Sequence, residues 1–293
     1  MKKRSALSLT MWSFGVCCFM VLNVGMGVIL AIAETTAEDF VRMGMKHYAK
    51  GQFQDALGVF DKAIVVKPDY ALAYTNRGLI KYRLGDITAA IADHSHAIEL
   101  EPKMAEAYTN RGAARLAQGD LNGSIADHSE ALKLEPNLVT ALNNRGLVRI
   151  QSGDTAGGIS DLDKALEINP FDPSAYTNRA AAHLQLKDLE KAAMDASKAL
   201  VLNPKLSEAH VLRGRIYLEA KMFTKSLEDF DKAVELNPQL GTAYLNRGAV
   251  KVALKNYEAG IHDLNKGVEL LPVLESEAKR WIQHAQAQLE KKQ

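Results

Sequence analysis

Apolar residues recur along most of the chain with the spacing of one helical face, in short segments that come in pairs. Within residues 71–104, Leu79 and Tyr82 mark a first amphipathic segment, and Ile91 and Ile98 mark a second. A spacing of three, four or seven residues places side chains on one side of an α-helix. The pattern therefore predicts two helices that bury their apolar faces against each other.

Proline shows that this pair of helices is repeated at a fixed interval. Seven prolines stand 34 residues apart, and the only other proline is Pro173. The seven are Pro68, Pro102, Pro136, Pro170, Pro204, Pro238 and Pro272. A period of this length is typical of a solenoid, in which small units stack because none can bury its apolar face alone. The predicted units are 37–70, 71–104, 105–138, 139–172, 173–206, 207–240 and 241–274.

The turn inside each unit can be predicted from the same alignment. Glycine stands at the expected turn in the first four units and lysine in the last three, so we expect the last three hairpins to turn at some conformational cost. The turn residues are Gly51, Gly85, Gly119, Gly153, Lys187, Lys221 and Lys255. The next residue is aspartate in four units and is placed to cap the second helix. These caps are Asp86, Asp120, Asp154 and Asp188.

Small residues recur at fixed positions, counted here from the first residue of each unit. Position eight is glycine in six units and Ala180 in the fifth, and positions 20 and 27 are also small. Glycine in a helix interior costs about 0.5–1 kcal/mol relative to alanine, so its return at position eight requires a packing reason, such as the close approach of two helices.

With a bulky residue at position four and proline at position 32, these features make the chain resemble the tetratricopeptide repeat proteins over residues 37–274. The position-four residues are Phe40, Tyr74, Tyr108, Leu142, Tyr176, His210 and Tyr244. The resemblance implies an all-α fold, a right-handed solenoid of antiparallel helix hairpins whose first helices line a concave groove that accepts peptides or partner proteins. Residues 275–293 place Ala278, Trp281 and Ala285 on one helical face, and we expect them to form a capping helix over the last hairpin.

Position six supplies a candidate binding groove. It holds asparagine in five units, Arg42 in the first and Leu212 in the sixth. An amide donates and accepts hydrogen bonds, so a column of amides can pair with the backbone of an extended peptide. The predicted groove residues are Asn76, Asn110, Asn143, Asn144, Asn178, Asn246, Thr75, Thr109 and Thr177. The alternative is that these amides tie adjacent repeats together.

Two comparisons limit what such a groove could bind. The asparagines resemble the amide-lined surface of the repeat region in O-linked N-acetylglucosamine transferases, and only that feature carries over. Repeat proteins that clamp a chaperone's terminal carboxylate use basic residues at position five and at position two or six. Positions two and five hold no lysine or arginine here. We therefore expect no carboxylate clamp.

Two further columns are charged and vary together. Arginine at position seven and aspartate at position 23 are both present in six repeats, whereas the first repeat has Met43 and Val59. Partly buried charges need partners, so we expect ion pairs within a hairpin or between adjoining hairpins rather than a site for anions. The arginines are Arg77, Arg111, Arg145, Arg179, Arg213 and Arg247. The aspartates are Asp93, Asp127, Asp161, Asp195, Asp229 and Asp263.

Residues 1–33 have the pattern of an export signal. Lys2, Lys3 and Arg4 precede a stretch without charge, and Ala31 and Ala33 fit a signal-peptidase site. The stretch is long enough to span a bilayer, so the sequence leaves open cleavage after Ala33 or retention of residues 5–33 as a membrane anchor. Either outcome places the repeats in the periplasm or on the extracellular face of the cell envelope.

Composition argues against nucleic acid and against thiol chemistry. The first 33 residues contain three of the 36 basic residues and none of the 35 acidic ones, so the remainder has a net charge of −2 and lacks the clustered cations that nucleic acid requires. Both cysteines, Cys17 and Cys18, belong to the apolar leader. The repeats therefore have no disulfide and no thiolate metal site.

Catalysis has little support in the sequence. The runs Asp93–Ser95 and Asp127–Ser129 contain the residue types of a hydrolase triad, with His94 and His128 in the middle. Consecutive helical side chains point about 100° apart, so they cannot form a hydrogen-bonded series, and both histidines fill a slot that is apolar in other repeats. We expect packed core histidines, no cofactor and no metal.

The predicted function is a non-enzymatic scaffold of the cell envelope that binds an extended peptide or partner segment in its groove. One alternative is a structural assembly factor that uses its convex face or its termini. A less favoured alternative is an enzyme with a helix-borne His/Asp site. The sequence does not identify the partner or the oligomeric state.

Overall fold

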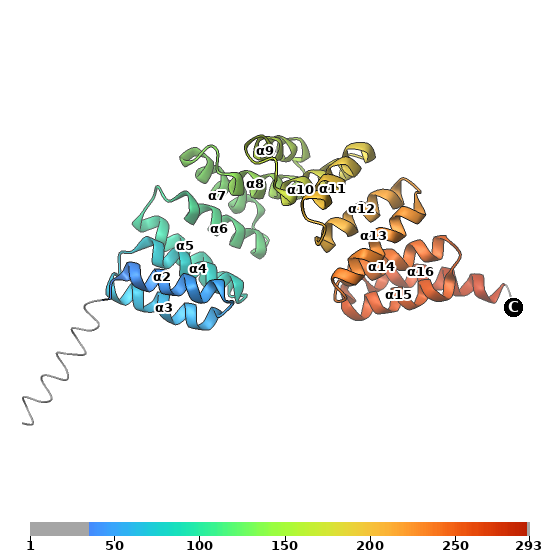
Figure 1. The fold of residues 1–293 in the computed structure, drawn as a ribbon, viewed down its shortest axis with the longest axis horizontal. Helices are drawn as coiled ribbons and strands as arrows, with labels where there is room; N and C mark the ends of the chain where they lie inside the picture. Colours follow the sequence, from blue (N-terminus) through green and yellow to red (C-terminus); the bar gives the residue numbers. More distant parts are fainter. Residues whose placement is uncertain (1–34, 292–293) are drawn as a thin grey trace, which may run out of the picture. The chain divides into compact units, whose positions relative to one another are not determined.

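The computed structural model describes residues 35–291, which form helices and no strand (Figure 1). The predicted leader, residues 1–33, lies outside the described residues together with Cys17 and Cys18. The chain divides into two compact units, the first ending at Gln118 and the second beginning at Gly119. The division falls between the two helices of the third hairpin, and each unit is described by itself.

The first unit contains two complete hairpins and the first helix of the third. Its helices are α2 (Ala37–Ala49), α3 (Phe53–Val66), α4 (Ala71–Arg83), α5 (Ile87–Leu100) and α6 (Ala105–Gln118). Phe60 and Ile80 are fully buried in its core.

The second unit continues the alternation of first and second helices and ends in one extra helix. Its helices are α7 (Leu121–Leu134), α8 (Val139–Gln151), α9 (Thr155–Ile168), α10 (Pro173–Gln185), α11 (Leu189–Leu202), α12 (Ser207–Glu219), α13 (Phe223–Leu236), α14 (Gly241–Ala253), α15 (Tyr257–Leu270), the 3₁₀ helix η1 (Pro272–Leu274) and α16 (Glu275–Glu290). The hairpin pattern predicted from the 34-residue period is confirmed.

Turns and caps lie where the alignment placed them. Asp86, Asp120, Asp154 and Asp188 each accept a hydrogen bond from the backbone N–H three residues later. The four turn glycines have φ between 72° and 95°, and Lys187, Lys221 and Lys255 have φ of 60°, 58° and 63°. A side chain in this left-handed region is strained, as predicted for the last three hairpins.

Pro173, the proline outside the 34-residue series, begins helix α10. Its missing N–H is not needed at the first helical position, and Asp172 caps the same helix by accepting from Ser174 and Ala175. The start of helix α10 therefore explains why proline stands at this position, independently of the 34-residue repeat.

Close packing within each hairpin explains the glycine at position eight. A Cβ added at Gly44 would lie 2.6 Å from the ring of Phe60, and one at Gly214 would lie 2.7 Å from that of Phe230. These rings belong to position 24 of the same repeat. In the fifth repeat, where position eight is Ala180, position 24 is Ala196, and both are fully buried. The two helices approach so closely that positions eight and 24 share a fixed volume.

First helices of successive hairpins contact each other within each unit. In the second unit α8 contacts α10, α10 contacts α12, and α12 contacts α14, whereas the second helices α7, α9, α11, α13 and α15 of the same unit make no comparable contacts with one another. The first helices therefore form the inner side of the stack. We call this side of the second unit, formed by α8, α10, α12 and α14, the first-helix face.

Candidate functional site

The asparagines of position six lie on first helices, but two of them use their donor locally. Asn76 is buried and its Nδ2 donates to the backbone oxygen of Leu72 at 2.8 Å. Asn246 Nδ2 donates to the backbone oxygen of Thr242 at 2.7 Å. Both bonds are made within one helix, because an amide four residues ahead of a carbonyl reaches it readily.

Two asparagines link neighbouring repeats. Asn178 Nδ2 on α10 donates to Asn143 Oδ1 on α8 at 2.8 Å. Such a contact is the alternative predicted from the sequence, in which the amides tie adjacent repeats together. Both side chains are half-buried. The bond does not involve Asn143 Nδ2 or Asn178 Oδ1, so this donor and this acceptor remain available.

Asn110 and Asn144 differ from the others because neither amide has a hydrogen bond to any residue in the described range. Asn110 lies on α6 in the first unit and Asn144 on α8 in the second, and both are half-buried. An amide in this state keeps its two donors and its acceptor for a ligand or for water.

The threonines of position five are mostly structural. Thr75 and Thr109 are only 1% and 6% exposed, and their hydroxyls donate to the backbone oxygens of Ala71 and Ala105. Thr177 is half-buried and bonds in the same way to Pro173 at 2.8 Å. A buried hydroxyl bonded to its own helix adds nothing to an accessible surface. We therefore leave Thr75 and Thr109 out of the candidate surface.

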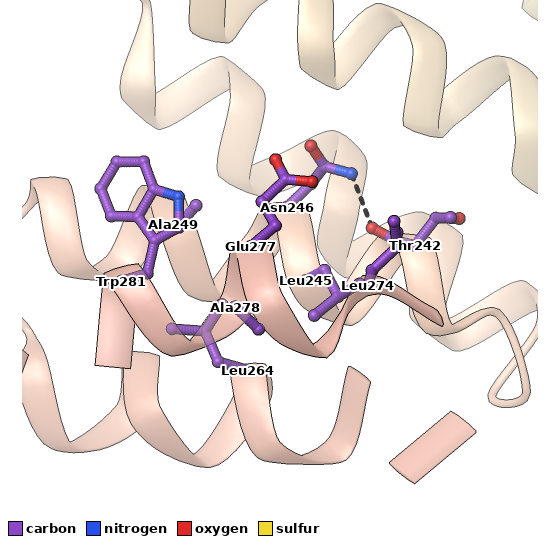
Figure 2. Close-up of a pocket in the computed structure, with 9 residues that line it drawn as sticks. All are labelled: Thr242, Leu245, Asn246, Ala249, Leu264, Leu274, Glu277, Ala278 and Trp281. Carbon is purple, nitrogen blue, oxygen red and sulfur yellow. Dashed lines mark hydrogen bonds between the residues drawn. The ribbon is translucent and has the colours of Figure 1, made fainter. Parts of the chain in front are cut away.

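A small cavity lies at the C-terminal end of the first-helix face, where the sequence indicated only a cap (Figure 2). Its volume is about 80 Å³, and α14, α15, η1 and α16 line it. The lining residues are Thr242, Leu245, Asn246, Ala249, Leu264, Leu274, Glu277, Ala278 and Trp281. Trp281 is 38% exposed rather than packed on the apolar face with Ala278 and Ala285, as the sequence had suggested. Its indole lies beside Ala249 on α14.

Arginine and aspartate of the two charged columns are paired within hairpins. Arg145 Nε and Nη2 donate to the two carboxylate oxygens of Asp161 at 2.8 and 2.6 Å. The same bidentate geometry joins Arg77 to Asp93, Arg179 to Asp195, Arg213 to Asp229 and Arg247 to Asp263. Arg111 and Asp127 lie in different units, and neither is without a partner. Each described pair ties a first helix to its own second helix.

The third nitrogen of each arginine extends the link to the preceding hairpin. Arg179 Nη1 donates to Asp163 at 2.6 Å, and Arg145 Nη1 donates to Ser129 Oγ at 3.2 Å. Position 25 supplies the acceptor in every case, as aspartate or serine. The remaining bonds join Arg77 to Asp61, Arg111 to Ser95, Arg213 to Ser197 and Arg247 to Asp231. One guanidinium thus connects three helices.

Burial and hydrogen bonding together set the pKa values of these groups. Hydrogen bonds that Arg77 donates to Asp93 raise the pKa of Arg77 and outweigh the desolvation that would lower it. Desolvation alone would raise the pKa of Asp229, but hydrogen bonds from His210 and Arg213 hold it below its usual value. The ionised forms are therefore stabilised as pairs.

Arg145→Met is expected to lower the free energy of unfolding by about 2 kcal/mol, because buried Asp161 would lose two charge-assisted hydrogen bonds and keep only Arg149, whose Nη1 lies 2.8 Å away. Urea denaturation measures the change. Arg215→Met, which removes an exposed arginine of α12, is the control and should change stability by less than about 0.5 kcal/mol. The loss should shrink in an Asp161→Asn background, and simple additivity of the two changes would contradict the pairing.

The two histidines of the triad-like runs are packed in the core. His94 is 1% exposed and His128 0%, and His94 Nδ1 and both ring nitrogens of His128 have no hydrogen-bond partner within residues 35–291. Ser95 Oγ accepts from Arg111 rather than from His94. Desolvation lowers the pKa of each histidine to about 4. A neutral, buried ring without a polar partner fits a packing role and not that of a base acting on a bound substrate.

Between residues 35 and 291, no three His, Cys, Asp or Glu side chains are grouped as metal ligands would be. No helix in this range combines the length and apolar character needed to cross a bilayer.

Family models match most of the repeat region. Models described as TPR repeat or tetratricopeptide repeat match residues 44–85, 78–119, 139–172, 162–193 and 207–240. No curated protein sequence matches the chain.

Solved structures agree with the hairpin architecture. A tetratricopeptide repeat protein from Parabacteroides merdae is 20% identical over 85% of this chain and 98% of its own, with a TM-score of 0.67. A chain of the APC/C hetero-tetramer Cut9–Hcn1 is 16% identical over 88% of this chain and 50% of its own, with a TM-score of 0.77. PilF from Pseudomonas aeruginosa is 17% identical over 74% of this chain and 97% of its own, with a TM-score of 0.63. The chain belongs to the tetratricopeptide repeat family, whose fold is a scaffold for protein–protein interaction.

Proposed function

We propose that the protein is a non-enzymatic scaffold that holds an extended segment of a partner protein on the first-helix face of its second unit. The observation that carries the proposal is Asn144, a half-buried amide on α8 with no hydrogen-bond partner in the described structure. Beside it in sequence is Asn143, whose Nδ2 is left over by the bond to Asn178. Together with Asn178 Oδ1 on α10, these groups offer donors and acceptors on two adjacent first helices, with which the backbone of an extended peptide could pair.

A neighbouring pocket supports the same proposal. Between α10 and α12 lies a pocket of about 370 Å³ whose lining includes Ala181, Leu184 and Leu212. Leu212 occupies position six on α12, where the other repeats of this unit have asparagine. A segment bonded to the amides of α8 and α10 could therefore place an apolar side chain here, which would add affinity that backbone bonds alone do not supply.

We place this scaffold outside the cytoplasm, at the cell envelope. The support is the sequence of residues 1–33, with basic residues followed by an uncharged stretch. Whether Ala33 is the last residue removed or the leader remains as an anchor would be settled by the mass of the mature N-terminal peptide.

Site-specific photo-crosslinking tests the proposed face. A photoreactive phenylalanine placed at Asn144 in the full chain should capture a partner in the native cell, because this residue faces the bound segment. The matched control is the same group at Val201, which is 75% exposed on the second helix α11. Capture from position 201 and not from position 144 would contradict the proposal and favour assembly through the outer face. Capture from position 144 should also disappear on adding Asn178→Ala, with the circular dichroism spectrum unchanged.

A further inference from the structure

Helix α16 continues the series of first helices with a shift of one residue. Along the repeats, equivalent buried residues are 34 apart, as are Ala209 and Ala243. Ala278 and Ala285, the buried residues of α16, follow Ala243 and Val250 of α14 by 35. The 3₁₀ helix η1 lies between α15 and α16 in the chain, and its turn accommodates the extra residue. On this register, Glu277 and Trp281 are the equivalents of Thr242 and Asn246.

These four residues meet at the cavity of about 80 Å³ described above. Thr242 and Asn246 line it from α14, and Glu277 and Trp281 line it from α16, which packs against α14 and α15 (Figure 2). The cavity thus lies in the same row as the amides of position six. A segment that follows the first-helix face to its C-terminal end would reach it.

The polar groups of the cavity favour a cation. Glu277 is exposed and has no ion-pair partner among residues 35–291. Asn246 uses its Nδ2 on Thr242 O, so its Oδ1 remains available, and Figure 2 shows this oxygen and the Glu277 carboxylate on the same side of the cavity. Trp281 adds the face of an indole, which attracts cations. The cations of the adjacent helix turn, Arg247 and Lys251, are both bound to Asp263 at 2.7 Å.

The floor and size of the cavity favour a narrow side chain. Leu245, Leu264 and Ala278 supply apolar surface for methylene groups. The cavity, at about 80 Å³, has about half the volume of a cavity that holds a benzene ring, about 150 Å³, so a narrow chain fits it better than a ring. An ammonium on a methylene stem meets both conditions, because it is a compact charge carried by apolar groups.

We propose that this cavity binds the side chain of a lysine in the partner segment. The methylenes lie on Leu245 and Leu264, and the ammonium donates to Glu277 and to Asn246 Oδ1 beside the ring of Trp281. The inference rests on the proposed peptide-binding function and adds to it a preferred residue at one end of the segment.

The direct test uses n-butylammonium as the probe and Trp281 fluorescence as the signal. The full chain in detergent carries Trp12→Phe, which leaves Trp281 as the single tryptophan. Butylammonium should change the emission at concentrations about fivefold below those at which uncharged n-butanol does so. Glu277→Gln should remove this difference, whereas the control Glu290→Gln, on the same helix, should keep it. An equal response to butanol, or an unchanged response in Glu277→Gln, would overturn the proposal; a stronger response to n-butylguanidinium would overturn the choice of lysine.

A peptide arm separates this inference from the function on which it rests. Immobilised libraries of extended ten-residue peptides each carry one fixed residue, either lysine or norleucine, and are probed with the full chain. Preference for the lysine library that is lost in Glu277→Gln supports the inference. Binding to both libraries alike, sensitive to Asn144→Ala, would overturn the lysine site and leave the peptide scaffold standing. Binding to neither library would count against both.

Discussion

Replacing Phe230 with alanine is expected to lower the free energy of unfolding of the second unit by about 4 kcal/mol, because the ring is fully buried and its removal leaves a cavity. The ring packs with Val211, Ala233, Ala243 and Val250. It also lies against Gly214, where no side chain fills the space between the helices. Urea denaturation followed by circular dichroism measures the loss.

A second substitution tests whether positions eight and 24 share one volume. Gly214→Ala alone should destabilise by about 1–3 kcal/mol, because its Cβ would lie 2.7 Å from the ring of Phe230. In the Phe230→Ala background the same change should stabilise by about 1 kcal/mol, since alanine favours the helix and partly fills the cavity. The native pair Ala180 and Ala196 already has this combination. A loss of equal size in both backgrounds would show that the two positions do not interact.

Mild acid is expected to destabilise the protein by about 2 kcal/mol for each of His94 and His128 between about pH 7 and about pH 5. Burial lowers the pKa of each folded histidine to about 4, whereas an unfolded histidine titrates near 6.5. The unfolded chain therefore binds more protons in this window, so stability falls as the pH falls from 6.5 towards 4. Burial is the largest cause of the lowered pKa of His94; Asp93 favours protonation of the ring, and Arg111 and Lys81 oppose it. For His128, Asp127 favours protonation of the ring and Arg145 opposes it.

Variants identify the histidines as the source of this pH dependence. His94→Phe and His128→Phe place in the slot the residue that Phe60 supplies beside Gly44, so they should fold and flatten the decline between about pH 7 and about pH 5. His262→Gln, which changes a side chain that is 81% exposed, should leave the decline unchanged. Denaturant midpoints at several pH values provide the measurement. A slope that persists in the double phenylalanine variant would mean that other groups cause it; Asp229 and Asp263 are poor candidates, because their lowered pKa values make them titrate at more acidic pH.

The repeat explains why so much of the fold was predictable. Each helix is marked seven times, so the turn at Gly85, the cap at Asp86 and the close approach at Gly78 could be inferred by comparing copies of one unit. The arginine and aspartate columns could be paired because both are missing from the first repeat. Local chemistry that is repeated in sequence is visible without coordinates.

The candidate surface was less predictable because a polar side chain can form any of several hydrogen bonds that differ little in free energy. An asparagine on a first helix can bond to its own carbonyl, as Asn76 does, to a neighbouring amide, as Asn178 does, or to nothing, as Asn144 does. The residue type does not distinguish these outcomes, since each bond differs by about 1 kcal/mol or less in net free energy. The spacing of Ala278 and Ala285, equal to that of Ala243 and Val250, was the one available signal for the cavity at α16.

The extra residue before α16 also sets how such an array can lengthen by duplication. A copied unit inserted before Gly241 would keep every 34-residue interval, and each new arginine would find an acceptor at position 25 of the unit before it. A copy placed after Leu274 would give the same sequence, and the α16 that follows would again be displaced by one residue, or about 100° of helical rotation, from the 34-residue register. New units therefore fit before α16, which keeps its one-residue shift and its tryptophan, whereas a unit that followed α16 would start out of register.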